Sequence, residues 1–245
     1  MTVSVAALVR QLAADGPLLG AAAERAGWEA PVPSTDWTVR ELVTHVGGVH
    51  RWAADLVARC GDTVDTEAGG AVGTGPADAE LLDWFAAGHT ALVETLYAAP
   101  EDLQCVTFLP AASPLAFWAR RQAHETAIHR VDAESAGGPV TAFDADFAQD
   151  GIGELLQGFA ARKRKPLEAA TLMLRASDGP SWQITLGAEG VRAEPAENAG
   201  RAQVLVEGTS SELYLWLWNR ASAAVVRGDA AVARRWAETV QVRWS

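Results

Sequence analysis

The stretch of the chain with the clearest chemical content is residues 120–134, which read RRQAHETAIHRVDAE. Glu125 and His129 are four residues apart. On a helix this spacing places a carboxylate and an imidazole on the same face, one turn apart. A third candidate ligand, His45, lies in another helical pattern, ELVTHVGGVHRW. Two imidazoles and one carboxylate from two helices would make a three-ligand metal site with one open position, which is the arrangement of a catalytic metal centre.

The same stretch does not match the zinc-protease motif HExxH. That motif requires two histidines four residues apart, on one face of a helix. His124 and His129 are five residues apart, so about 140° separates them around the helix axis, at roughly 100° per residue. We therefore expect Glu125 to be a metal ligand and not the general base of a protease, and we expect His124 to point away from the face of Glu125.

Two of the three proposed ligands also have a simpler interpretation. His45 follows Leu42 by three residues and is expected to point into the protein, where a lone histidine can be an ordinary core residue. A buried Glu125 needs a cation, because an unpaired buried carboxylate is costly. That cation could be a metal ion or Arg121, one turn earlier. His50 and His89 are expected to be polar residues at the surface or facing loops.

Asp132 is the second residue of this stretch with a possible catalytic role. It follows His129 by three residues, so its carboxylate could orient a metal ligand or a substrate from outside the coordination sphere. The alternative is an ordinary salt bridge with Arg121 or Arg130. The sequence leaves these two interpretations open.

Composition narrows the class of protein. The chain has 245 residues and a formal net charge of −11, which argues against binding to nucleic acid and to anionic membrane surfaces. Cys60 and Cys105 form no CxxC motif, so neither a disulfide framework nor a zinc knuckle is indicated. We expect a cytoplasmic protein, because the beginning of the chain lacks the pattern of a signal peptide and no apolar run approaches the roughly 18 residues of a membrane span.

The first part of the chain, residues 1–150, carries helical periodicity and predicts a four-helix bundle. An amphipathic stretch starts at Val5, is interrupted by Gly16-Pro17 and continues to Ala26. A capping box at Thr38–Glu41 predicts a helix to about residue 58. Two further helices are expected over about 78–98 and 114–135, and residues 61–76 are expected to form a long loop.

The pattern changes in the last third of the chain. Short strand-like runs at 170–175, 182–186, 191–194 and 203–206 are separated by turn signals, one of them at 198–200. A capping box at Thr209–Glu212 predicts a helix, and Asp229 can cap a last helix that reaches Trp236. We therefore expect a small α+β domain over 166–245, joined to the bundle by a helical connection at 151–165. The overall fold class is multidomain, α then α+β.

Two segments carry a resemblance to a known family. DWTVRELVTHVGGVHRWA and RRQAHETAIHRVDAE are similar to the mycothiol-dependent maleylpyruvate isomerase family of actinobacteria, which belongs to the DinB/YfiT-like metalloenzymes. LYLWLWNRASAAVVRGDAAVARRW resembles the small C-terminal domain of the same family, which is similar to sterol-carrier-type α+β folds. The resemblance covers nearly the whole chain. It implies a DinB-like metal-binding bundle followed by a sterol-carrier-like domain, and the high Ala, Gly and Arg content also suits an actinobacterial genome.

The resemblance also implies functions for individual residues. The metal ligands of the family match His45, Glu125 and His129, and the basic residue that the C-terminal domain contributes to the site best matches Arg220. The expected cofactors are a divalent metal, with zinc favoured, and the thiol mycothiol. A metal-bound thiol ionises at neutral pH, and Arg220 would hold the carboxylate of an anionic substrate. Without the resemblance, Arg220 is simply a cation at the end of a helix.

The expected activity is therefore the isomerisation or S-conjugation of a small electrophilic substrate, by a monomer or homodimer. In an isomerase the thiolate adds to a conjugated double bond and leaves after rotation, whereas in an S-transferase it stays on the product. Two alternatives remain open on the same bundle. One is a metal-dependent hydrolase or amidase that uses metal-bound water, and the other is a non-catalytic binding or regulatory protein, for instance an anti-sigma-like or carrier module.

Overall fold

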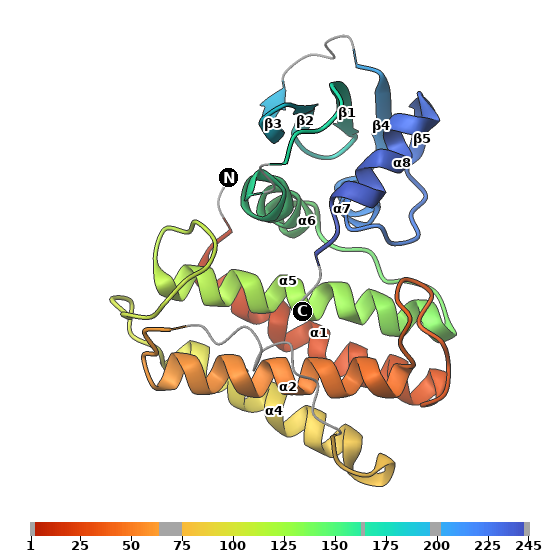
Figure 1. Ribbon diagram of the computed structural model, residues 1–245. Helices are drawn as coiled ribbons and strands as arrows, with labels where there is room; N and C mark the ends of the chain where they lie inside the picture. Colours follow the sequence, from red (N-terminus) through yellow and green to blue (C-terminus); the bar gives the residue numbers. More distant parts are fainter. Residues whose placement is uncertain (1–2, 64–74, 163–164, 197–201, 243–245) are drawn as a thin grey trace. The chain divides into compact units, whose positions relative to one another are not determined.

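The computed structural model describes residues 3–63, 75–162, 165–196 and 202–242 (Figure 1). The chain divides into two compact units, residues 3–141 and residues 142–242, which we call the bundle unit and the sheet unit. Most of the loop expected at 61–76 and the turn expected at 198–200 lie outside the described residues. None of the helices in the described ranges is both long enough and apolar enough to cross a membrane.

The bundle unit contains the four long helices that the periodicity predicts. They are α1 (Val5–Ala26), α2 (Val39–Ala58), α4 (Asp78–Ala98) and α5 (Pro114–Gly137). Helix α1 packs against α4 and α5, and α2 packs against the same two helices (Figure 1). The capping box at Thr38 and Glu41 is formed, and Ser113 caps α5 immediately before Pro114. The predicted four-helix bundle is therefore confirmed.

Helix α1 runs without a break through Gly16-Pro17, so the interruption expected there is wrong. A proline inside a helix removes one backbone hydrogen bond, but residues on both sides of it are anchored in the same core. Leu12 and Leu19 are both fully buried. Packing of an apolar face stabilises helices in proteins more than local propensity does, and here it outweighs the loss at Pro17.

Helices α2 and α4 pack closely at two glycines, one on each helix. The guanidinium of Arg51 lies 3.9 Å from the centroid of the Trp84 ring and donates to the carbonyls of Gly47, over 3.0 Å, and of Trp84. A Cβ atom on Gly47 would lie 2.2 Å from the Trp84 ring, and one on Gly88 would lie 2.2 Å from Arg51 Nη1. The two glycines therefore make room for this stacked pair between the helices.

The sheet unit is a mixed sheet with helices, as the predicted α+β domain requires. Its strands are β1 (Ala170–Ala176), β2 (Ser181–Gly187), β3 (Gly190–Ala196), β4 (Val204–Gly208) and β5 (Val225–Gly228). They lie in the order β3-β2-β1-β4-β5, in which β1 and β4 are parallel and the other neighbouring strands are antiparallel. The sequence did not predict β5, because all four of its residues are exposed and give no alternating pattern. The helical elements of this unit are α6 (Ala145–Gly153), η1 (Glu154–Phe159), η2 (Ala160–Arg162), α7 (Ser210–Leu217) and α8 (Ala230–Thr239).

The boundary between the units lies at Thr141, earlier than the expected position near residue 150. Helix α6 packs against α7 and so belongs to the sheet unit. Phe143 and Phe147 lie 5.5 and 6.4 Å from the ring of Tyr214, measured between centroids. The Phe143 amide also donates to the hydroxyl of Ser211 over 3.0 Å. These aromatic contacts explain why the segment after Thr141 folds with the C-terminal elements.

Candidate metal centre

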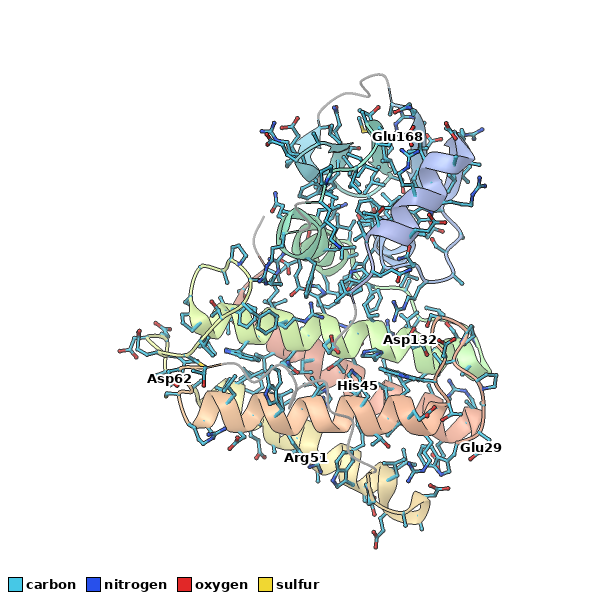
Figure 2. All side chains as sticks on the ribbon, viewed as in Figure 1. Glu29, His45, Arg51, Asp62, Asp132 and Glu168 are labelled. Carbon is cyan, nitrogen blue, oxygen red and sulfur yellow. The ribbon has the colours of Figure 1, made fainter. Side chains whose placement is uncertain are left out.

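The structure brings His45, Glu125 and His129 together inside the bundle unit. Each offers one ligand atom, and these atoms all lie within 4.8 Å of one another, with all three residues buried. Glu125 Oε1 lies 3.4 Å from His45 Nε2 and 3.2 Å from His129 Nε2. His45 comes from α2, and the other two residues come from successive turns of α5 (Figure 2, in which His45 is labelled). Two imidazole nitrogens and a carboxylate oxygen are a donor set that suits zinc.

Glu125 has an arginine partner as well as its two histidines. Arg121 Nη2 donates to Glu125 Oε2 over 3.0 Å, so the arginine partner is observed at one oxygen, while the other oxygen faces His45 and His129, where a metal ion would bind. Burial raises the pKa of Glu125, but hydrogen bonds from His129 and His45 and the charges of His129 and Arg121 outweigh it and hold the pKa well below its usual range. Glu125 is therefore ionised, as a metal ligand must be.

Asp132 lies behind His129, on the side away from Glu125. Its Oδ2 atom is 2.9 Å from His129 Nδ1, and its Oδ1 atom accepts from the Ser34 hydroxyl over 2.5 Å. Burial lowers the pKa of His129, but the bonds and charges of Asp132 and Glu125 raise it to about 9. A carboxylate bonded to Nδ1 directs Nε2 toward the ligand group, as in carboxylate–histidine–metal triads. The orienting role expected of Asp132, which is labelled in Figure 2, thus has the matching geometry.

Sequence reasoning missed two neighbours of this centre, Ser34 and Trp37. The Trp37 ring lies 4.8 Å from the His45 ring and 6.1 Å from the His129 ring, measured between centroids. Both residues precede the helix that carries His45. Trp37 belongs to the DWTV segment that carries the resemblance noted in the sequence, and Ser34 lies three residues before it. Neither signal shows that the segment folds back over α5.

The expectation that His50 and His89 face solvent or loops is wrong, because both are buried. His50 Nε2 lies 2.8 Å from the Thr126 hydroxyl, and His89 Nε2 donates to the carbonyl of Leu12 over 2.9 Å. Burial lowers the pKa of both rings. Helix α2 packs against both α4 and α5, so two of its faces are buried. The single apolar stripe in its sequence underestimates how much of the helix is buried. His124 is also buried but stands outside the ligand group.

Arg220 lies in the sheet unit, just beyond the end of α7. Its backbone N–H donates to the carbonyl of Leu215 over 2.9 Å, and its Nη1 atom donates to the carbonyl of Trp218 over 2.8 Å. These bonds satisfy carbonyls at the C-terminal end of a helix, where a cation is favourable. The simpler role of Arg220 is therefore observed, and its role toward a substrate is part of the proposal below.

The fold and the site define a class of two-unit proteins with a candidate metal centre in a helical bundle. Two family models match this chain: "Mycothiol maleylpyruvate isomerase N-terminal domain" over residues 9–134 and "MDMPI C-terminal domain" over residues 146–235. The chain belongs to the mycothiol maleylpyruvate isomerase family, which confirms the resemblance seen in the sequence.

Solved structures agree with this assignment at the level of the fold. A crystal structure of a histidine-to-alanine mutant of the mycothiol-dependent maleylpyruvate isomerase matches with a TM-score of 0.67 at 15% identity, covering 94% of this chain and 97% of the other. A second crystal structure of that isomerase matches with a TM-score of 0.58 at 14% identity and the same coverage. No curated protein sequence matches this chain significantly.

Proposed function

We propose that this protein is a metal-dependent enzyme that uses mycothiol to isomerise or S-conjugate a small, electrophilic, anionic substrate. The observation that carries the proposal is the buried group of His45, Glu125 and His129, whose ligand atoms lie within 4.8 Å of one another. Membership of the mycothiol maleylpyruvate isomerase family supports the choice of thiol. The donor set fits zinc, which accepts nitrogen, oxygen and sulfur ligands and keeps an open position in catalytic sites.

We assign one group of residues to binding the metal ion and a different residue to binding the substrate. His45, Glu125 and His129 would bind the metal, Arg121 fixes the carboxylate of Glu125, and Asp132 fixes the ring of His129. A bound zinc ion supplies Lewis acidity, which lowers the pKa of a thiol at its open position. We assign the binding of a substrate carboxylate to Arg220, because a guanidinium can make two parallel hydrogen bonds to it.

The reaction follows from the nucleophilicity of a thiolate. The mycothiol sulfur adds to a conjugated carbon–carbon double bond, and the electron pair moves onto the activating carbonyl. The former double bond is then single and rotates, after which the electron pair returns and expels the thiolate. The net change is a cis–trans isomerisation with no atoms gained or lost. In S-transfer, the same adduct takes up a proton and the thiol stays on the product.

The proposal includes small-molecule partners and a cytoplasmic location. A net charge of −11 disfavours nucleic acid and anionic membranes as partners. A low-molecular-weight thiol is available as a cosubstrate in a reducing compartment. We expect the enzyme to act as a monomer or homodimer. All three proposed ligands come from one chain, so the metal centre needs no residue of a partner subunit.

The proposal is tested by metal content and thiol dependence measured together. Metal-free protein is prepared with a chelator, reloaded with zinc, and assayed on maleylpyruvate with and without mycothiol. We expect about one zinc per chain in the wild type, little in Glu125→Ala, and wild-type content in Glu94→Ala, which removes an exposed carboxylate of α4. Turnover should require both zinc and mycothiol. Full zinc occupancy in Glu125→Ala would contradict the site, and thiol-independent hydrolysis would favour a hydrolase.

A further inference from the structure

Residues 31–38, the second part of the segment between α1 and α2, are folded back on themselves. We call residues 31–38 the α1–α2 loop. Pro31 and Thr38 form an isolated antiparallel bridge, and the Val32 amide donates to the Trp37 carbonyl over 2.8 Å. The Trp37 amide donates to the hydroxyl of Thr35 over 3.1 Å. These bonds give the loop a defined shape directly before the helix that carries His45.

One side chain of this loop reaches the network behind the metal centre. The hydroxyl of Ser34 donates to Oδ1 of Asp132, and Oδ2 of the same carboxylate is the partner of His129 Nδ1. Asp132 is fully buried. Because Ser34 occupies one oxygen, the carboxylate cannot rotate freely and keeps its other oxygen on the imidazole. Ser34 thus acts on His129 through Asp132.

A second side chain of the loop lies against both imidazole ligands. The Trp37 ring is 4.8 Å from His45 and 6.1 Å from His129, tilted by 46° and 32° respectively. The two imidazoles are themselves 5.2 Å apart and nearly perpendicular, at 78°. The indole packs beside both imidazole rings, closer to that of His45 than to that of His129. A large rigid ring in this position limits how far the neighbouring imidazoles can turn, which favours the orientation in which both Nε2 atoms face Glu125.

We propose that Ser34 and Trp37 are positioning residues, through which the α1–α2 loop holds the two histidine ligands in the orientation that binds the metal. Neither side chain is expected to touch the ion. The inference rests on the proposed function, since it requires a metal at His45, Glu125 and His129. Removal of outer partners of metal ligands typically costs about 10- to 100-fold in metal affinity, and we expect the loss for Ser34→Ala to fall at the lower end of that range.

The test is a titration of metal-free full-length protein with zinc, in competition with a chromophoric chelator. We expect Ser34→Ala to weaken zinc binding about tenfold and Ser34→Thr, which keeps the hydroxyl, to restore it. Trp37→Leu should weaken binding, and Trp37→Phe, which keeps a ring, should weaken it less. Ser135→Ala is the matched control, because it removes a serine of α5 outside this network.

Two further measurements separate positioning from a general structural role. The melting temperature of metal-free Ser34→Ala should stay close to that of the wild type, whereas Trp37→Leu shortens a side chain packed against the core and is judged by its zinc affinity and cobalt spectrum. The visible absorption of the cobalt(II)-loaded protein should change in Ser34→Ala and Trp37→Leu, because it reports the geometry of the ligands, and it should not change in Ser135→Ala. If Ser34→Ala does not fold, Ser34→Cys keeps the size of the side chain with a weaker donor, and we expect the same loss of affinity.

The outcomes distinguish this inference from the proposed function. A wild-type protein that binds no zinc overturns the metal centre and, with it, this inference. A wild type that binds zinc, with Ser34 and Trp37 variants that match it in affinity and cobalt spectrum, overturns the inference alone. A lowered melting temperature with unchanged zinc affinity also overturns it, because the loop would then support only the fold.

Discussion

Arg121 and Glu125 form a buried ion pair one helical turn apart, in which Arg121 Nη2 donates to Glu125 Oε2 over 3.0 Å. Both side chains are almost completely buried. The pair leaves Oε1 of the same carboxylate facing His45 and His129. The arginine therefore neutralises the carboxylate on one side while the other side stays available to a cation.

Replacing Arg121 should make the protein depend on metal for its stability. Arg121→Met removes the cation at Oε2 of the buried Glu125 carboxylate, which keeps its bonds to His129 and His45. Breaking one side of a buried pair typically costs about 3–5 kcal/mol, and these remaining bonds place the expected loss at the lower end. We expect a loss of this order in the metal-free protein by urea unfolding. Zinc should raise the melting temperature of the variant more than that of the wild type, because the ion replaces the missing charge. Equal zinc-induced increases would contradict this prediction.

The matched control for Arg121→Met is Arg59→Met. Arg59 pairs with Asp55 at the same four-residue spacing, but both side chains are mostly exposed. Exposed pairs of this kind contribute little to stability, because water and salt screen the two charges. The control should therefore change neither stability nor the response to zinc by a comparable amount.

Two glycines of α1 should respond in opposite ways to alanine. A Cβ atom at Gly16 would lie 2.3 Å from Nε2 of His89, whereas one at Gly20 would meet Phe85 at 3.9 Å, an ordinary contact. We expect Gly16→Ala to cost about 1–3 kcal/mol in the free energy of unfolding, since overpacking displaces His89 from Leu12. Gly20→Ala should stabilise by about 0.5–1 kcal/mol.

A double variant tests the cause assigned to the Gly16 effect. Gly16→Ala combined with His89→Ala should be less destabilised than the sum of the two single variants, because alanine at position 89 removes the clashing ring. Additive losses would show that Gly16 is required for another reason.

A third prediction concerns Asp15, a fully buried carboxyl on α1. Burial raises its pKa to about 6, against the effect of the Arg130 guanidinium, whose Nε atom is 3.3 Å away. Gln11 donates to the same carboxyl over 3.0 Å. The charges of Glu134 and His124, both on α5, also act on it, the first raising and the second lowering its pKa.

The raised pKa of Asp15 fixes the sign of its effect on stability. Between about pH 4 and 6 the unfolded chain has lost this proton and the folded chain retains it, so the free energy of unfolding falls as pH rises. The interval from 3.8 to about 6 corresponds to on the order of 3 kcal/mol. Asparagine has no such proton to lose. The free energy of unfolding of Asp15→Asn, minus that of the wild type, should therefore increase by on the order of 3 kcal/mol as pH rises from 4 to 7.

Urea unfolding at several pH values checks the Asp15 prediction. Asp83→Asn is the control, since Asp83 is exposed on α4, and its stability difference from the wild type should stay nearly constant with pH. A constant difference for Asp15→Asn as well would show that the carboxyl ionises normally in the folded protein.

Arg220 can be tested by a change that keeps its charge. Lysine preserves a donor for the carbonyl of Trp218 but cannot make the paired hydrogen bonds of a guanidinium. We expect Arg220→Lys to lower kcat/KM for an anionic substrate roughly tenfold or more, with zinc content and melting temperature nearly unchanged. Arg227→Lys, at an exposed position on β5, should keep wild-type turnover. If Arg220→Lys has a lower melting temperature but wild-type kcat/KM, then Arg220 acts only as a cation at the end of α7.

Helical spacing was sufficient to predict that His45, Glu125 and His129 meet, because the four-residue interval in α5 and the apolar stripe of α2 fix which way the three side chains point. Most helix and strand positions followed from caps and periodicity in the same way. The burial of His50 was not predictable, since it depends on α2 packing against two helices at once. The unit boundary was missed because Phe143 and Phe147 fit a bundle helix equally well until Tyr214 is placed beside them.

The contributions of Ser34 and Trp37 could not be read from the sequence for a different reason. The hydrogen bond from Ser34 to Asp132 joins residues 98 positions apart, and neither residue type predicts such a contact. Periodicity describes regular elements, whereas the position of the α1–α2 loop depends on the tertiary fold.

The close packing of Gly47, Arg51 and Trp84 has a consequence for how this family can evolve. A larger residue at position 47 collides with the indole, and a smaller residue at position 84 leaves the guanidinium of Arg51 without its stacking partner. Each change alone should destabilise the contact between α2 and α4, so divergence at these sites should favour paired or triple substitutions. In an alignment of relatives, positions 47, 51 and 84 should therefore covary, with a small residue at 47 wherever an aromatic ring occupies 84.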